Sequence, residues 1–165
     1  MVAMAGAAAS AIRVVVFRLD TQSYAVSLDS VIRVERMVAV SPLPRAPHVC
    51  LGVVNVHGQI VPVLDLRRRL GLAPRAYGVD AQLLIARTSA RTVAIPVDAV
   101  TRVESAAQLQ VTPTRDIVPG IEHVEGILPI GDELLFIHDV ERFLSKSEER
   151  EIQAAIEGMG DAGHA

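Results

Sequence analysis

The chain repeats itself, and this repetition constrains the fold more than any other feature of the sequence. The segment SYAVSLDSVIRVE (residues 23–35) aligns without a gap with TVAIPVDAVTRVE (residues 92–104), at an offset of 69. A second block, GVVNVHGQIVPVLDLRRRL (residues 52–70), aligns with GILPIGDELLFIHDVERFL (residues 126–144) at an offset of 74. Because internal repetition marks a duplicated structural unit, the sequence predicts two copies of one β-rich unit.

A unit of roughly 65 residues buries little surface on its own, so we expect the two copies to share a core. Two small fused units with a seam between them indicate a docking body rather than a catalytic cleft. The predicted organisation is a flexible tail (1–11), a single domain (12–157) with two copies (about 12–72 and 81–145) and a terminal helix (145–157), and a second flexible tail (158–165).

Composition narrows the class of protein. Half of the residues are hydrophobic but only 3% are aromatic, so the core must consist of Val, Ile and Leu, which favours strands. A net charge of −3 gives no electrostatic footprint for nucleic acid. No apolar run reaches the roughly 18 residues of a membrane span, and the N-terminus does not resemble a secretory signal. We therefore expect a cytoplasmic protein that neither inserts into a membrane nor binds nucleic acid.

Turn and cap residues predict where several elements begin and end. A tight hairpin is expected at His57–Gly58, because glycine tolerates positive φ. Asp65 is predicted to cap the short helix that follows, and Gly71 to end it. The corresponding residues in the second copy and at the terminal helix are Gly131–Asp132 for the hairpin, Asp139 for the cap, and Ser145 with Glu148 for a capping box.

Residues capable of chemistry have ordinary structural interpretations. Asp65 and Asp139 occupy equivalent positions in the two copies, which favours capping over a catalytic pair. The only cysteine, Cys50, is interpreted as a small buried hydrophobe, and the histidines show no ligand spacing for a metal. The basic run 67–69 with Arg75 is interpreted as a solvated helix face, with an acidic partner as the alternative. The sequence thus predicts no catalytic residue, no cofactor and no metal.

The longest motif reads G-V-x-N-x-x-G-x-I-V-P-V-x-D-L-R from Gly52 to Arg67. With IPVDAVTRV and EGILPIGDELLFIHDVERFLS in the second copy, it makes the chain resemble the CheW-like family, the adaptors of bacterial chemosensory arrays. The resemblance runs from about Val14 to Glu157. It implies a mainly β fold of two tandem five-stranded SH3-like barrels with short helices and a C-terminal helix.

The resemblance also implies a function. Such a protein is a non-catalytic adaptor, or scaffold, that couples chemoreceptors to the histidine kinase CheA in two-component chemotaxis signalling. The implied partners are the regulatory domain of a CheA-type kinase and the cytoplasmic tip of methyl-accepting chemoreceptors, with assembly into rings together with the kinase. Recruitment to receptor arrays follows from these partners.

Carried over position by position, the receptor-contact residues would be Val31, Arg33, Val54, Asn55, His57 and Gln82. The chain departs from the family at two of them: the family usually has Glu where Arg33 stands and Arg where His57 stands. Glu35, on the same strand face as Arg33, is expected to compensate in part.

Two alternative functions remain open at the level of sequence. The departures at Arg33 and His57 raise the alternative of an adaptor for a non-flagellar chemosensory pathway, or of one that has lost receptor binding. A small-molecule-binding β-barrel module would require a deep polar pocket with converging titratable groups in place of an apolar seam.

Overall fold

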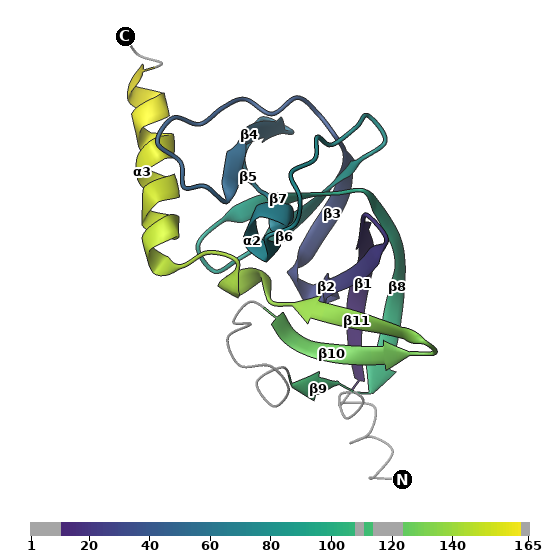
Figure 1. Cartoon of the computed structure of the whole chain (residues 1–165). Helices are drawn as coiled ribbons and strands as arrows, with labels where there is room; N and C mark the ends of the chain where they lie inside the picture. The colour runs from purple at the N-terminus through teal and green to yellow at the C-terminus, as the bar shows by residue number, and fades with distance from the viewer. Residues whose placement is uncertain (1–10, 108–110, 114–123, 163–165) are drawn as a thin grey trace.

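The computed structural model describes residues 11–107, 111–113 and 124–162, and shows two β-sheets with a long helix along one side (Figure 1). The elements are β1 (Ala11–Leu19), β2 (Gln22–Ser27), η1 (Leu28–Ser30), β3 (Val31–Arg36), β4 (Cys50–Val56), β5 (Gln59–Leu64), α2 (Leu66–Leu70), β6 (Gln82–Arg87), β7 (Thr92–Val97), β8 (Ala99–Ala107), β9 (Thr112–Pro113), β10 (Val124–Ile130), β11 (Glu133–His138), η4 (Val140–Arg142) and α3 (Lys146–Ala162).

The strands form one sheet of six and one of five. Sheet A has the order β8-β1-β2-β11-β10-β9, and sheet B the order β3-β6-β7-β5-β4. The sixth strand of sheet A, β9, contains two residues; its counterpart in the first copy is the isolated bridge between Ser41 and Val53. The mainly β fold of two small sheets with short helices and a C-terminal helix confirms the predicted fold class.

Each sheet is built from both copies of the repeat. In sheet A, the hairpin β1–β2 of the first copy lies between β8 and the hairpin β11–β10 of the second. In sheet B, the hairpin β6–β7 of the second copy lies between β3 and the hairpin β5–β4 of the first. The two copies therefore exchange their first hairpins, and the boundaries of the sequence repeats do not coincide with those of the sheets.

This exchange explains why the strands are apolar on both sides. Along β1, Val14 and Val16 face a small core inside sheet A, whereas Val15 and Phe17 face the main core. The main core also includes Leu84, Ile95 and other residues of sheet B, so it fills the seam between the sheets. This is the shared core expected for two copies that are each too small to be stable alone. Strands buried on both faces have near-continuous rather than alternating hydrophobicity.

The predicted turns and caps are present. The Asp65 side chain accepts a hydrogen bond from the Arg67 amide at 3.0 Å, and Gly71 ends α2 in the left-handed region with φ of 70°. Both residues of the β4–β5 turn have positive φ, 51° at His57 and 85° at Gly58. In the second copy, Asp139 caps the 3₁₀ turn η4 instead of an α-helix.

Gly52 and Gly126, which align in the repeat, allow a close crossing of two segments. Gly52 has φ of 151°, and a Cβ added there would collide with the carbonyl oxygen of Ser41. A Cβ at Gly126 would collide with the Val111 side chain and lie 3.1 Å from the Thr112 carbonyl oxygen. The two glycines thus recur because each copy lays its preceding segment directly against this strand.

The terminal helix α3 begins with the predicted capping box. The Ser145 amide donates to Glu148 Oε1 at 2.8 Å, and the Glu148 amide donates to Ser145 Oγ at 3.0 Å. The predicted end at Glu157 is too early, because α3 continues to Ala162. Partly buried Met159 packs against the main core and extends the apolar face of the helix into this last part. The remaining predicted tail residues, 1–10 and 163–165, lie outside the described residues.

Candidate functional site

The part of the chain that the structure describes holds no catalytic or metal-binding constellation. Among those residues, no group of three or more His, Cys, Asp or Glu side chains is arranged to hold a metal ion. Burial raises the pKa of the Cys50 thiol, which keeps it protonated and unreactive. The carboxylates of Asp65 and Asp139 are engaged as caps. In the same ranges, no helix combines the length and apolarity needed to cross a membrane.

The interpretation of the arginine run as a solvated face is wrong for Arg67. Its side chain is only 2% exposed, because α2 turns it into the junction between the sheets. There its two terminal nitrogens donate to the two carboxylate oxygens of Asp20 at 2.9 and 2.7 Å, and one lies 3.4 Å from Asp98. Hydrogen bonds from Arg67 and then from Arg75 hold the pKa of Asp20 well below its usual range.

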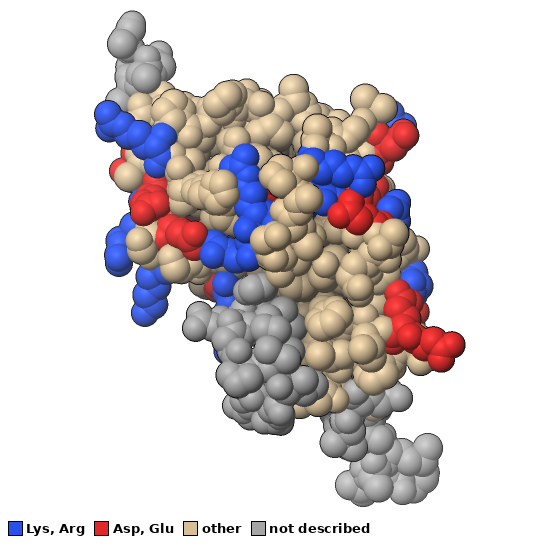
Figure 2. Space-filling view, viewed as in Figure 1, with Lys and Arg blue, Asp and Glu red and all other residues tan. Residues whose placement is uncertain are grey.

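The neighbouring basic residues are also tied into the structure. Arg69 donates to both carboxylate oxygens of Glu148 at 2.7 Å, linking α2 to α3, and Arg68 donates to the His48 carbonyl oxygen at 2.7 Å. On the face shown in Figure 2, basic and acidic side chains are interspersed rather than gathered by sign. The run 67–69 therefore stabilises the fold and does not form an open basic patch.

A different cluster of charged residues is exposed where β3 passes the tip of the β4–β5 hairpin. Glu35 Oε1 lies 2.9 Å from His57 Nε2 and 3.6 Å from Arg33 Nε. The Arg33 and His57 side chains are 47% and 64% exposed. Glu35 thus serves both basic groups, as expected from its place on the strand, and it pins the hairpin tip to β3.

Asn55 completes this exposed group, which we call the hairpin face (Arg33, Glu35, Asn55 and His57). Its Oδ1 accepts from the Gly58 amide at 2.8 Å, so this side chain holds the turn in shape. Beside it lies a cavity of about 230 Å³ with a partly apolar lining. The lining residues are Glu35, Arg36, Val38, Asn55, Val56, His57 and Leu83.

The other three residues carried over from the family lie elsewhere. Val54 is 2% exposed in the small core of sheet B, so its side chain is not presented to a partner. Gln82 Oε1 accepts from the Val100 amide at 2.7 Å. Val31 packs against the main core, and a register shift separates it from Arg33 along β3. The structure therefore brings Arg33, Asn55 and His57 together but not Val31, Val54 and Gln82.

The family pattern did not point to Arg36 and Val38, which border the same cavity. Val38 is 46% exposed and adds apolar surface beside the charged hairpin face. The one signal in the sequence is their position: Arg36 is the last residue of β3, and Val38 follows it before the proline-containing segment begins.

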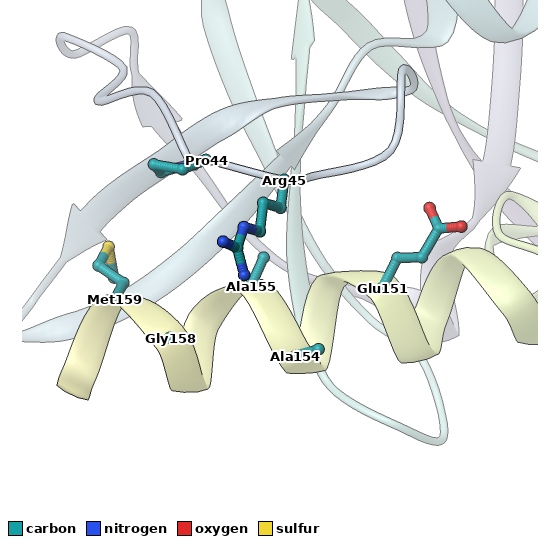
Figure 3. A pocket seen from close by; sticks show the side chains of 7 residues that line it. All are labelled: Pro44, Arg45, Glu151, Ala154, Ala155, Gly158 and Met159. Atoms are coloured by element: carbon teal, nitrogen blue, oxygen red, sulfur yellow. The ribbon is translucent and has the colours of Figure 1, made fainter. Parts of the chain in front are cut away.

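A second hollow, of about 530 Å³, lies between α3 and the segment before β4. Figure 3 shows Arg45 reaching from that segment towards the helix beside Ala155, with Glu151 farther along the helix. Its lining is otherwise small or apolar: Pro44, Ala154, Gly158 and Met159. One base and one acid without a converging nucleophile do not make a catalytic site.

Comparison with known proteins gives one consistent result. Residues 13–148 match the model of a family described as the CheW-like domain. A chemotaxis protein CheW from Rhizobium meliloti (strain 1021) is 29% identical over 139 residues, covering 83% of this chain and 89% of that protein. Protein FrzA from Myxococcus xanthus is 29% identical over 119 residues, covering 68% and 71%.

A solved structure is similar as well. The crystal structure of the scaffolding protein TtCheW from Thermoanaerobacter tengcongensis superposes with a TM-score of 0.75 at 25% sequence identity. The match covers 83% of this chain and 94% of that one. The similarity therefore extends over both sheets and is not confined to one repeat.

Proposed function

The chain belongs to the CheW-like domain family, and from this membership we propose that it couples chemoreceptors to a CheA-type histidine kinase in chemotaxis signal transduction. The observation that carries the proposal is the family match over residues 13–148, which includes strands of both sheets. The role is that of a non-catalytic adaptor, acting in the cytoplasm and recruited to receptor arrays through its partners.

The hairpin face is the proposed contact for the chemoreceptor tip. Three of the carried-over residues, Arg33, Asn55 and His57, are exposed side by side there. Glu35 holds the hairpin tip against β3, and the adjoining cavity can receive a side chain of the receptor. Charged groups at the rim of such a patch tune partner choice more than affinity.

The kinase regulatory domain is proposed to dock on the ends of sheet A, which are β8 and β9. The end strands of sheet B, β3 and β4, carry the hairpin face and are left to the receptor. An end strand offers unpaired backbone groups that a homologous barrel can engage. The two ends of sheet A, β8 and β9, would also allow ring assembly with the kinase.

A second candidate function is an adaptor of a non-flagellar chemosensory pathway, or one that no longer binds receptors. The observation in its favour is the altered charge at Arg33 and His57 relative to the family pattern. The small-molecule-binding alternative finds no support at the seam, because apolar side chains of the main core, such as Phe17 and Ile95, fill it.

A pull-down separates these functions. The full chain is presented in turn with a CheA regulatory domain and with a chemoreceptor cytoplasmic fragment. Binding to both supports the coupling function, and binding to the kinase domain alone supports the adaptor without a receptor. Binding to neither contradicts the proposal.

A further inference from the structure

The hairpin face has a counterpart in the second copy of the repeat. At the offset of 69, Arg33 corresponds to Arg102 and Glu35 to Glu104, both on β8. At the offset of 74, Gln59 corresponds to Glu133 at the start of β11. The same strand therefore passes the same hairpin in both halves of the molecule, and the two arrangements can be compared residue by residue.

In the second copy, the strand arginine is satisfied within the chain. Arg102 Nε lies 2.5 Å from Glu104, and its Nη2 lies 3.1 Å from Glu133. A side-chain hydrogen bond with Ser23 and another with Arg102 lower the pKa of Glu133, so that carboxylate stays ionised at neutral pH. Two carboxylates thus surround one guanidinium.

In the first copy, basic side chains outnumber carboxylates instead. Among the described residues, Arg33 has one ion-pair partner, Glu35, at 3.6 Å. That carboxylate is shared with His57 at 2.9 Å. The position that supplies Glu133 in the other half holds neutral Gln59. One carboxylate therefore serves two basic side chains, and exposed Arg36 adds further positive charge beside them.

Apolar residues flank the charge at equivalent places in both copies. Val34 and Ile60 are exposed in the first copy, and their counterparts Val103 and Leu134 are exposed in the second. Val34 directly follows Arg33 and projects from the other face of β3, but β3 is an end strand of sheet B, where one partner can cover both faces. The occupant that fits must bring negative charge as well as apolar surface.

We infer that the receptor segment docking on the hairpin face supplies the second carboxylate of Arg33, from an aspartate or glutamate that takes the place held by Glu133 in the other half. This inference rests on the proposed function and names the chemistry of the partner. Arg33 is then a specificity-determining residue, because a receptor without the acid leaves its guanidinium with only the shared carboxylate of Glu35.

The chain offers a test in which the missing carboxylate is built into the molecule. Gln59→Glu places an acid at the position equivalent to Glu133, so it should satisfy Arg33 internally and repel the receptor's acid. We expect it to weaken binding of a chemoreceptor cytoplasmic fragment about fivefold, the size of one exposed ion pair. Arg33→Gln should weaken binding by a similar factor, and Arg33→Glu by about twentyfold.

Arg150→Gln is the matched control, because Arg150 is an exposed arginine on α3, away from the hairpin face. It should leave receptor binding unchanged. Binding of a CheA regulatory domain should be the same for all four variants and the parent chain, and circular dichroism should show the same fold. A purely structural role for Arg33 would predict no loss of receptor binding in Gln59→Glu.

A double-mutant cycle identifies the partner group. Each acidic residue of the receptor tip is changed to its amide, and the fragment is titrated with the parent chain and with Arg33→Gln. One receptor variant should lose about fivefold with the parent chain and lose nothing more with Arg33→Gln. If the parent chain binds receptor and no receptor acid couples to Arg33, the inference is wrong and the proposed function stands. If the parent chain binds no receptor, both are overturned.

Discussion

The residue that most distinguishes this chain from a simple pair of barrels is Arg67. It joins the turn after β1, through Asp20, to the turn between β7 and β8, through Asp98. These turns belong to different copies of the repeat, so one guanidinium ties the two halves together. A buried arginine of this kind stabilises the fold only while its carboxylate partners are in place.

Arg67→Ala should therefore destabilise the protein by about 2–4 kcal/mol, because it removes the buried cation that joins Asp20 to Asp98 and leaves them only the more exposed Arg75 and Arg18. Guanidinium chloride unfolding followed by circular dichroism measures the change. Arg75→Ala is the control: Arg75 also binds Asp20 at 2.7 Å, but from an exposed position, so its loss should cost less than about 1 kcal/mol. Equal losses in the two variants would contradict the central role of Arg67.

The ion pair of Asp20 and Arg67 should also affect how stability depends on pH in the acid range. Because the pKa of Asp20 is lowered in the folded state, its contribution to stability is complete above the unfolded value of about 4 and is lost as the pH falls from there towards the folded value. Asp20→Asn should thus flatten the loss of stability below about pH 4, measured by thermal unfolding at a series of pH values. Asp80→Asn, at an exposed loop position, should not, and identical acid profiles for Asp20→Asn and the parent would refute the assignment.

The burial of Arg67 between the sheets could not be predicted from the sequence. Three consecutive arginines on a helix suggest a solvated face, and nothing local marks the middle of the junction. The carboxylates that draw it inward lie 47 and 31 residues away, and they meet it only after the hairpins have been exchanged. The structure shows the equivalent contact in the other half, where Glu141, at the position that corresponds to Arg67, accepts a hydrogen bond from Ser89, the counterpart of Asp20.

At the scale of elements, the glycines at the start of the second hairpin of each copy control how tightly the chain crosses itself. Gly52→Ala combines a positive φ with a collision against the Ser41 carbonyl oxygen, so it should destabilise by more than about 2 kcal/mol. Chemical denaturation measures the change in the free energy of unfolding.

Gly71→Ala separates the effect of a positive φ from the effect of a colliding Cβ. Gly71 has φ of 70°, but a Cβ there meets no atom within 4 Å, so only the backbone strain of about 1 kcal/mol applies. If Gly52→Ala costs no more than Gly71→Ala, then the close crossing of Ser41 over β4 does not constrain the fold.

Elements were predictable where their signals are local. The caps at Asp65 and Ser145 and the turn at His57–Gly58 depend on residues within a few positions of one another, and the structure has all three. The side-chain directions in β3 were not predictable in this way. Alternation along a strand puts Val31 and Arg33 on one face, but the register shift between them against β6 breaks it.

At the scale of the whole molecule, the exchange of hairpins makes the two halves interdependent. A fragment of residues 1–78 would keep the hairpins β1–β2 and β4–β5, but the neighbours that connect them within the sheets are β8, β11, β6 and β7 of the other half. Isolated hairpins are marginally stable in water. The sequence repeat predicts two units. Repetition alone does not reveal whether each unit forms its own sheet or contributes strands to the sheet of the other.

Fragments 1–78 and 79–165 should accordingly be unfolded when alone and should regain the β-sheet spectrum when mixed. The break falls in the exposed connection before β6, where Val79 is 94% exposed, so the cut itself disturbs little. Circular dichroism of each fragment and of the equimolar mixture provides the test. A cooperative unfolding transition in either fragment alone would show that the halves fold independently.

The coupling function is tested most directly by sedimentation velocity on a mixture of the full chain, a CheA regulatory domain and a chemoreceptor cytoplasmic fragment. We predict a ternary complex in which the chain binds both partners at once, because β8 and β9, at the ends of sheet A, belong to a different sheet from the hairpin face on β3 and the β4–β5 hairpin. Arg33→Glu should remove the receptor from that complex and leave the kinase domain bound. Binding of neither partner, or competition between the two for the chain, would contradict the account.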